Sequence, residues 1–447
     1  MKILIDNNIQ HSRECSCEGG LKWSVWNDVT DMSDGTVVVF NTRWRTAVLM
    51  SAHEYGIARS HCQDTTLQRL GMIVYSGTEE RREWREAYEA ARRDMSYLDI
   101  TVVLTERCQF GCVYCFEGAR KACRTIGDDV AQAVMRIVEG GGSQLRRLRI
   151  TWFGGEPMLA YDKMVQMSEM VIPYCEEHGI AYSADITTNG YALTPARIAQ
   201  MVDSLKIRTY IITLDGTAKV HDKRRPLLSG RGSFDRIWSN IATLVGHGVF
   251  VLVRITIDRR NVDDVTALID IIAEAGWAGK VCLAFCRTID VSFTPKQTGQ
   301  FIYTEREFAD VEWKLVQYAH GKHLVDYGFP HAAPKGGCLR DGDIVIGPRG
   351  EVYKCLDTIG DERWVAGNVV DNIQAQQPQW LETWRSWMPD DMPGCRQCVL
   401  QPLCSGGCPH NALFGDKRHG TTMQCPDWKA NYKRNIIALI DETNQTV

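Results

Sequence analysis

The sequence predicts an α/β protein: a partial barrel of six parallel strands, with an N-terminal α+β segment before it and a cysteine-rich domain after it. Two observations support this fold class. Over residues 97–290, short runs rich in β-branched and aromatic residues alternate with segments of helical period, which is typical of repeated βα units. Beyond residue 335 that periodicity is lost and Gly, Pro and Cys dominate. A small segment of this kind needs a metal or a cross-link to stabilise it.

Six strands are expected, at Tyr97–Leu104, Leu148–Phe153, Tyr182–Thr187, Thr209–Leu214, Phe250–Ile257 and Lys280–Phe285. Between them apolar residues recur at helical spacing, for example at Ile237, Ile241 and Leu244, which predicts a helix between neighbouring strands. Six units are fewer than the eight of a closed barrel, so an open barrel is expected. Functional sites in such sheets lie at the C-terminal ends of the strands.

The first 95 residues have a different pattern, with a predicted hairpin (Thr36–Asn41 and Arg45–Met50) and a charged helix near Glu79–Asp94. We expect five segments: an α+β segment at 1–95, the barrel at 96–290, a bridging region at 291–337, a cysteine-rich domain at 338–430 and a C-terminal helix or tail at 431–447.

The composition is that of an ordinary soluble protein, with a formal net charge of -4 and a pI near 6.3. This charge gives no drive toward nucleic acid or an anionic membrane. The chain has no apolar run of about 20 residues, the length that spans a bilayer, and no signal peptide, so we expect a cytoplasmic protein. Thiols stay reduced there, and the 17 cysteines therefore indicate metal or cluster binding.

The first cysteine group follows the first predicted strand, in the pattern Cys108-x3-Cys112-x2-Cys115. Three thiolates on one short loop can hold three irons of a 4Fe–4S cube and leave the fourth iron open. A structural zinc ion prefers four protein ligands, which makes this spacing unusual for zinc.

This loop, with Tyr114 before its last cysteine, resembles the radical S-adenosylmethionine (SAM) superfamily. Gly154-Gly155-Glu156-Pro157 resembles the superfamily's glycine-rich segment, in which the glycines allow close approach and Glu156 offers an acceptor to the cofactor ammonium. The resemblance implies that Tyr114, Gly154, Gly155 and Glu156 bind S-adenosylmethionine. It implies further contacts at later strand ends, from Asn189, Thr213, Asp215 and Arg254.

A second pattern of seven cysteines resembles the SPASM extension of radical enzymes, which carries two auxiliary 4Fe–4S clusters. By that resemblance one cluster is bound by Cys395, Cys398, Cys404 and Cys425, and the other by Cys338, Cys355 and Cys408. The second set is one ligand short. Either one iron of that cluster is open, or Cys282 or Cys286 supplies the fourth ligand. If neither is a ligand, we expect both to be buried structural cysteines. Two zinc ribbons are the alternative.

The resemblance implies a peptide maturase that uses three 4Fe–4S clusters and S-adenosylmethionine to form a thioether or carbon–carbon cross-link. Its expected partners are a precursor peptide with a leader and a flavodoxin- or ferredoxin-type reductant. The hairpin at 36–50 is expected to offer a strand edge to the leader, or else to pack as an appendage of the barrel.

Two alternatives remain. An anaerobic sulfatase maturase would carry an acidic base directly after Cys355, where Leu356 stands; Asp357, one residue further, is the candidate catalytic residue. The other is a non-enzymatic electron carrier.

Overall fold

The computed structural model describes residues 1–7, 20–115, 123–289, 296–330, 337–371, 378–415 and 425–445. The chain divides into two compact units. One comprises Asp94–Asp326 and Asp341–Glu382, and the other comprises Met1–Arg93, Tyr327–Arg340 and Thr383–Val447. We call them the barrel unit and the cysteine unit, and describe each by itself.

The barrel unit contains the six predicted parallel strands. They are β7 (Tyr97–Thr105), β8 (Arg147–Gly154), β9 (Ala181–Thr188), β10 (Ile207–Thr213), β11 (Phe250–Ile257) and β12 (Val281–Arg287), and they pair in sequence order. The prediction is confirmed, with ends that differ by at most two residues. The register brings Thr213 of β10 beside Arg254 of β11.

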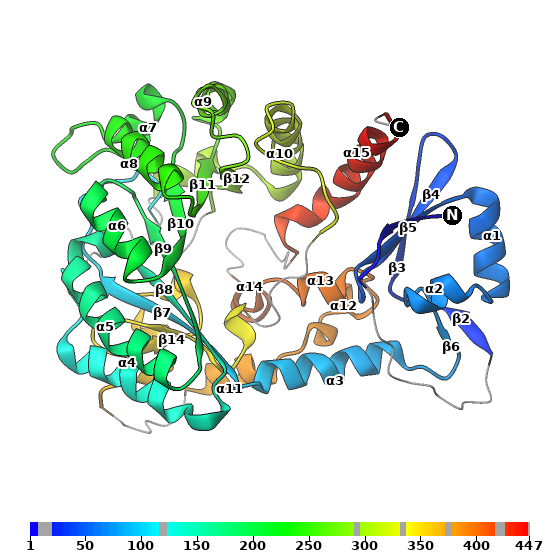
Figure 1. Ribbon diagram of the computed structural model, residues 1–447, viewed down its shortest axis with the longest axis horizontal. Coiled ribbons are helices and arrows are strands. Elements are labelled where there is room, and N and C mark those ends of the chain that lie inside the picture. The colour runs from blue at the N-terminus through cyan, green and yellow to red at the C-terminus, as the bar shows by residue number, and fades with distance from the viewer. Residues whose placement is uncertain are drawn as a thin grey trace. The chain divides into compact units, whose positions relative to one another are not determined.

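Helices cover the outer face of this sheet (Figure 1). They are α4 (Asp128–Gly140), α5 (Tyr161–Glu177), α6 (Pro195–Asp203), α7 (Ala218–Arg224), α8 (Phe234–Gly246), α9 (Val262–Glu274) and α10 (Glu305–His320). Residues alternate along β11, where Val251, Val253 and Ile255 are buried beneath the helices and Arg254 and Thr256 lie on the opposite, partly exposed face. That opposite face is available for polar chemistry.

Three further strands extend the sheet beyond β7: β13 (Asp343–Ile346), β14 (Glu351–Tyr353) and β15 (Gly367–Asn368). β13 runs parallel to β7, and β14 and β15 continue as antiparallel neighbours. The sequence did not predict them, because runs of two to four residues carry little periodicity. As a result, Cys355 follows a strand of the barrel sheet.

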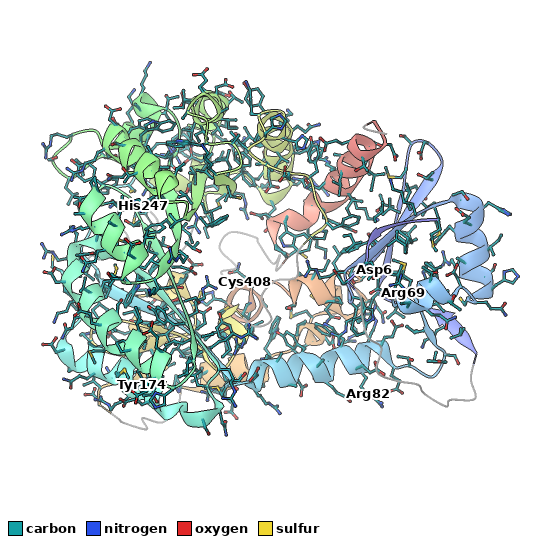
Figure 2. The ribbon with its side chains drawn as sticks, viewed as in Figure 1. Asp6, Arg69, Arg82, Tyr174, His247 and Cys408 are labelled. Atoms are coloured by element: carbon teal, nitrogen blue, oxygen red, sulfur yellow. The ribbon has the colours of Figure 1, made fainter. Side chains whose placement is uncertain are left out.

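The cysteine unit contains a sheet of order β1-β5-β4-β3, formed by β1 (Lys2–Ile5), β3 (Asn27–Asp31), β4 (Thr36–Asn41) and β5 (Thr46–Ser51). A second sheet pairs β2 (Leu21–Trp23) with β6 (Ile73–Tyr75), and α1 (Ala52–His61) and α2 (Thr65–Arg69) lie between β5 and β6 in the chain. An ion pair of 2.6 Å joins Arg69 and Asp6, which lie side by side in Figure 2.

The predicted hairpin is confirmed as β4 and β5, but the expectation that it offers an open edge is wrong. Both strands are paired on both sides, β4 with β3 and β5, and β5 with β1 and β4. Among the described residues, the outer strands of this sheet are β1 and β3. Lys433 Nζ donates to Val29 O of β3 at 2.9 Å, which covers that edge in part.

The helix α3 (Glu80–Arg93) packs within the same unit against the cysteine-rich segment. Trp84 and Tyr88 of α3 share a buried cluster with Trp26, Leu339 and Trp387. The segment itself holds the end of α11 (Gln379–Ser386), then α12 (Pro393–Arg396), α13 (Gln401–Cys404), α14 (Pro409–Phe414) and α15 (Tyr432–Gln445).

Arg92, 6% exposed, fixes this packing. Its guanidinium donates to the carbonyl oxygens of Trp387 at 2.7 Å and Arg385 at 2.8 Å, and to Leu339 O at 3.2 Å. None of the described helices has the length and apolar character that a bilayer crossing requires.

Candidate functional site

The cluster loop, Cys108–Cys115, follows β7 and is paired along its backbone with residues 224–228, at the end of α7 and directly after it. The three hydrogen bonds are Gly111 N to Pro226 O (2.9 Å), Val113 N to Arg224 O (3.0 Å) and Leu228 N to Gln109 O (2.8 Å). This pairing satisfies the loop's buried backbone groups. The positions of the three cysteines are therefore set by a segment that lies more than a hundred residues later in the sequence.

A buried polar network fixes Tyr114 within this loop. The Tyr114 hydroxyl donates to Asp215 Oδ2 at 2.5 Å and accepts from Arg225 Nη1 at 2.7 Å. Asp215 is fully buried and also accepts from Thr256 N at 3.0 Å. Burial raises the pKa of Tyr114 well above its usual value, so the phenol stays neutral and keeps its proton for Asp215.

Arg225 places positive charge beside the cluster loop. Burial lowers the pKa of this guanidinium, but Cys112, Tyr114 and Asp215 raise it more, and its pKa lies well above the usual value. The neighbouring Arg224 pairs with Asp258 at 2.9 Å. Arg225 therefore remains charged inside the barrel unit.

Gly154 and Gly155 lie against the backbone that leads into the cluster loop. A side-chain carbon on Gly155 would lie 2.6 Å from the carbonyl oxygens of Glu106 and Arg107, and one on Gly154 would meet Thr105 O. Gly154 also has a φ of +140°, a conformation that favours glycine. In this structure the two positions must be glycine because the backbone of residues 105–107 packs directly against them.

Glu156 is fully buried and joins the ends of β8 and β9. Its carboxylate accepts from Thr188 Oγ1 (2.6 Å), Asn189 N (2.7 Å) and Met158 N (3.0 Å). A carboxylate has about four acceptor positions, so three are already used. The role of Glu156 toward a cofactor ammonium stays a prediction.

Asn189 connects the hydrogen bonds of Glu156 to the cluster loop. Its side-chain oxygen accepts from Gln109 Nε2 at 3.4 Å, and its Nδ2 lies 3.9 Å from Cys108 Sγ. The structure thus brings together Glu156, Asn189 and Cys108, which the sequence placed at the ends of three different strands. Tyr114 and Asp215 form the other predicted pair that it brings into contact.

Thr213 and Arg254 are neighbours on the partly exposed face of β10 and β11. Among the described residues, the Nε of Arg254 is a buried donor without a hydrogen-bond acceptor. A buried guanidinium donor of this kind fits the carboxylate of a bound ligand.

In the cysteine unit, Cys395, Cys398, Cys404 and Cys425 interact electrostatically with one another. Burial raises the pKa of the Cys395 thiol to about 11, and the three other thiols add to the rise. Among the described residues no three His, Cys, Asp or Glu side chains are placed to hold one metal ion. A four-iron cube holds its thiolates farther apart than one ion does.

The remaining predicted ligands lie in both units. Cys338 and Cys408 belong to the cysteine unit, and Cys355 to the barrel unit. Cys338 O accepts from Trp384 Nε1 at 3.1 Å, and Cys408, labelled in Figure 2, precedes α14 with its Sγ 3.5 Å from Asn411 N. The three cysteines stay a predicted ligand set.

Asp357 lies on the short turn Leu356–Thr358 after Cys355, and its catalytic role also stays a prediction.

The other cysteines differ in exposure. Cys282 on β12 is exposed, so the expectation that it is buried is wrong, and Cys286 is partly exposed. Both lie on the strand face that carries Arg254, because β12 alternates with β11 in register. Cys62 and Cys175 are buried and Cys123 is exposed. Cys15, Cys17 and His331 lie outside the described residues.

Comparison with known protein families supplies the deciding observation. Residues 102–272 match the model of the radical SAM superfamily, and this stretch includes the cluster loop, Glu156, Asn189, Asp215 and Arg254. The chain contains a radical SAM domain. Radical SAM domains are enzymatic and bind S-adenosylmethionine and a 4Fe–4S cluster.

Three characterised proteins are similar to this chain in sequence. The Fe-coproporphyrin III synthase of Methanosarcina barkeri is 27% identical over 38% of this chain, and the match spans 40% of that protein. The serine-type anaerobic sulfatase-maturating enzyme of Klebsiella aerogenes is 22% identical over 70% of this chain and 79% of its own length. The antilisterial bacteriocin subtilosin biosynthesis protein AlbA of Bacillus subtilis is 23% identical over 77% of this chain and 74% of its own length.

One similar solved structure is native anSMEcpe with bound AdoMet and the Cp18Cys peptide. It has 15% identity and a TM-score of 0.57, and the match covers 78% of this chain and 99% of that one. This likeness shows that the two share the radical SAM fold.

Sequence reasoning missed several residues that shape the two groups of candidate ligands. Residues 224–228 pair with the cluster loop, and Arg225 donates to the Tyr114 hydroxyl. Both contacts join residues more than a hundred positions apart, so no local pattern indicates them. Lys429, which contacts two of the predicted cluster cysteines, was also missed. Its position four residues after Cys425 is the signal that the sequence offers, because the short separation keeps the two residues close.

Proposed function

We propose that this chain is a radical SAM peptide maturase that forms a thioether, or alternatively a carbon–carbon, cross-link in a ribosomally made precursor. The observation that carries this proposal is the combination of the radical SAM domain with the four-cysteine group of the cysteine unit. An enzyme that needed only the radical would require the cluster loop alone.

Two similarities support a peptide substrate. The subtilosin biosynthesis protein matches over most of both chains, and the solved anSMEcpe structure contains a bound peptide as well as AdoMet. A precursor with a leader is therefore the proposed partner, together with a flavodoxin- or ferredoxin-type reductant. Because Lys433 covers part of β3, β1 is the described outer strand that is available for an added strand of the leader.

The barrel unit fits its cofactors through distinct residues. Cys108, Cys112 and Cys115 would hold the radical SAM cluster, and Arg254 would hold the methionine carboxylate of S-adenosylmethionine. When bound, these groups supply a 5′-deoxyadenosyl radical after one-electron reduction. Tyr114, Arg225 and Asp215 fix the loop, and Glu156 and Asn189 connect it to β8 and β9.

Electron balance requires a second redox group. The substrate loses one hydrogen atom to the radical, and a second hydrogen leaves as a proton when the carbon radical closes onto sulfur. One electron remains and must pass to an acceptor. We assign that role to auxiliary clusters bound by Cys395, Cys398, Cys404 and Cys425 and by Cys338, Cys355 and Cys408, which makes three 4Fe–4S clusters in all.

The second candidate is an anaerobic sulfatase-maturating enzyme, which the Klebsiella aerogenes relative supports. Leu356, exposed at 38%, directly follows Cys355 where such an enzyme would need an acid. Asp357 is the nearest carboxylate in the chain and would have to act as the base. This displacement by one residue favours the first proposal.

The two reactions are separated by their products. The reconstituted enzyme should be incubated anaerobically with S-adenosylmethionine, a reductant and short precursors encoded beside its gene. Either cross-link removes two hydrogens and leaves no aldehyde, as mass spectrometry will show, and a thioether also blocks the cysteine from alkylation. A product that reacts with a hydrazide contains formylglycine, and that result would replace the first proposal by the second.

A further inference from the structure

Lys429 contacts the four-cysteine group directly. It lies on the short helical turn Asp427–Ala430 after Cys425, and its Nζ is 3.4 Å from Cys398 Sγ and 3.4 Å from Cys425 Sγ. One ammonium thus reaches two of the four thiols that the proposed cluster would use.

Lys429 is partly buried beside Cys398 and Cys425. Among the described residues no carboxylate pairs with Lys429, which distinguishes it from a solvated surface lysine.

A second cation approaches the group from α3. Arg81 interacts electrostatically with Cys398, but its guanidinium stacks over Trp26 at 4.5 Å and donates to Gln397 O at 3.3 Å. Its hydrogen bonds are thus directed elsewhere. Of these two cations, Lys429 is the one that contacts sulfur directly.

From these contacts we infer that Lys429 donates N–H···S hydrogen bonds to Cys398 and Cys425 in the assembled auxiliary cluster and raises its reduction potential. This inference rests on the proposed cluster. The potential of an iron–sulfur cluster depends on net charge and on hydrogen bonds to its sulfurs. Reduction adds one negative charge, so a nearby cation stabilises the reduced state more than the oxidised one. The site is thereby tuned to accept the electron that is left when the substrate bond closes.

The test is a redox titration followed by electron paramagnetic resonance. The background is the variant in which all three cluster-loop cysteines are alanine, so that auxiliary clusters alone give a signal. Two substitutions are compared in this background. Lys429→Met removes the charge and the hydrogen-bond donors, and Lys429→Arg keeps both. Lys433→Met is the matched control, because Lys433 lies on the same segment and contacts Asp28 and Val29 instead of sulfur.

Lys429→Met should keep its iron and sulfide while its equilibrium constant for reduction falls roughly tenfold, equal to about 59 mV for one electron. Lys429→Arg should recover most of this shift, and Lys433→Met should show none. An unchanged midpoint in Lys429→Met with iron intact overturns the inference, as does an equal shift in the Met and Arg variants.

Two further outcomes are informative. If Lys429→Met does not retain its cluster, Lys429→Gln takes its place, because its amide is neutral but polar; an unchanged midpoint there overturns the charge argument in the same way. If the unmodified chain binds zinc at this site instead of iron, the proposed cluster itself is wrong. That failure is distinct from a cluster whose potential Lys429 does not affect.

Discussion

Replacing Glu156 by glutamine separates its structural role from its predicted cofactor contact. All three described partners of the carboxylate donate hydrogen bonds to it. Glutamine has one oxygen and one NH₂ group, so in either orientation its NH₂ meets a donor, and a buried N–H or O–H loses its acceptor. A hydrogen bond to a charged group contributes about 1.5–3 kcal/mol. We therefore expect Glu156→Gln to lower the free energy of unfolding by about 2–3 kcal/mol.

The assay is calorimetry of the protein without iron or S-adenosylmethionine. A loss of about 2–3 kcal/mol predicts a fall in the melting temperature of roughly 4–12 °C for a unit of this size. Glu169→Gln is the matched control, because Glu169 is an exposed residue of α5, and its melting temperature should not change. If Glu156→Gln melts like the wild type and loses only affinity for S-adenosylmethionine, Glu156 does not stabilise the fold by joining β8 to β9. Its role is then the contact with the cofactor ammonium.

Three other perturbations test separate parts of the molecule. Arg92→Met should lower the free energy of unfolding by about 3–5 kcal/mol, because hydrogen bonds from a charged donor contribute about 1.5–3 kcal/mol each and two short ones disappear. Chemical denaturation measures this change, and Arg93→Met, at an exposed neighbouring residue, should show none of that size. Burial raises the pKa of Asp258, but Arg260 and Arg224 lower it more, and the net pKa lies below its usual value. The stabilisation by the Asp258 carboxylate is therefore present above the pKa of an unfolded aspartate and is lost as pH falls through the pKa of the folded protein. Urea titrations should show that Asp258→Asn has a lower free energy of unfolding than the wild type at neutral pH, and that this difference shrinks in acid. Anaerobic reconstitution should give about twelve irons per chain and about eight when the three cluster-loop cysteines are alanine; four irons and two zincs would contradict the auxiliary clusters.

The barrel could be predicted because its signals are local. β11 was predicted with its observed ends, Phe250–Ile257, since alternation of buried and partly exposed residues is written along the strand itself. β13 could not be predicted, because four residues become a strand only by pairing with β7, far earlier in the sequence. The cluster loop was found by its cysteine spacing, whereas its pairing with residues 224–228 depends on tertiary structure.

Buried charges were the hardest feature to predict from the sequence. The helix α3 was predicted as a charged helix, yet Arg92 within it is only 6% exposed. Carbonyl groups almost 300 residues later in the chain determine its position. Because residues 1–93 form one compact unit with 383–447, an N-terminal deletion would expose this core as well as remove a proposed leader site. It therefore cannot isolate leader binding.

The central claim is that this radical SAM domain takes a hydrogen atom from a peptide. The most direct measurement is transfer of deuterium from a precursor labelled at the carbon that becomes cross-linked. Deuterium should appear in 5′-deoxyadenosine, with one label transferred for each cross-link formed. If 5′-deoxyadenosine forms without deuterium while the cross-linked peptide accumulates, the enzyme does not abstract that hydrogen. Unlabelled 5′-deoxyadenosine with an unmodified peptide would show that the peptide is not its substrate.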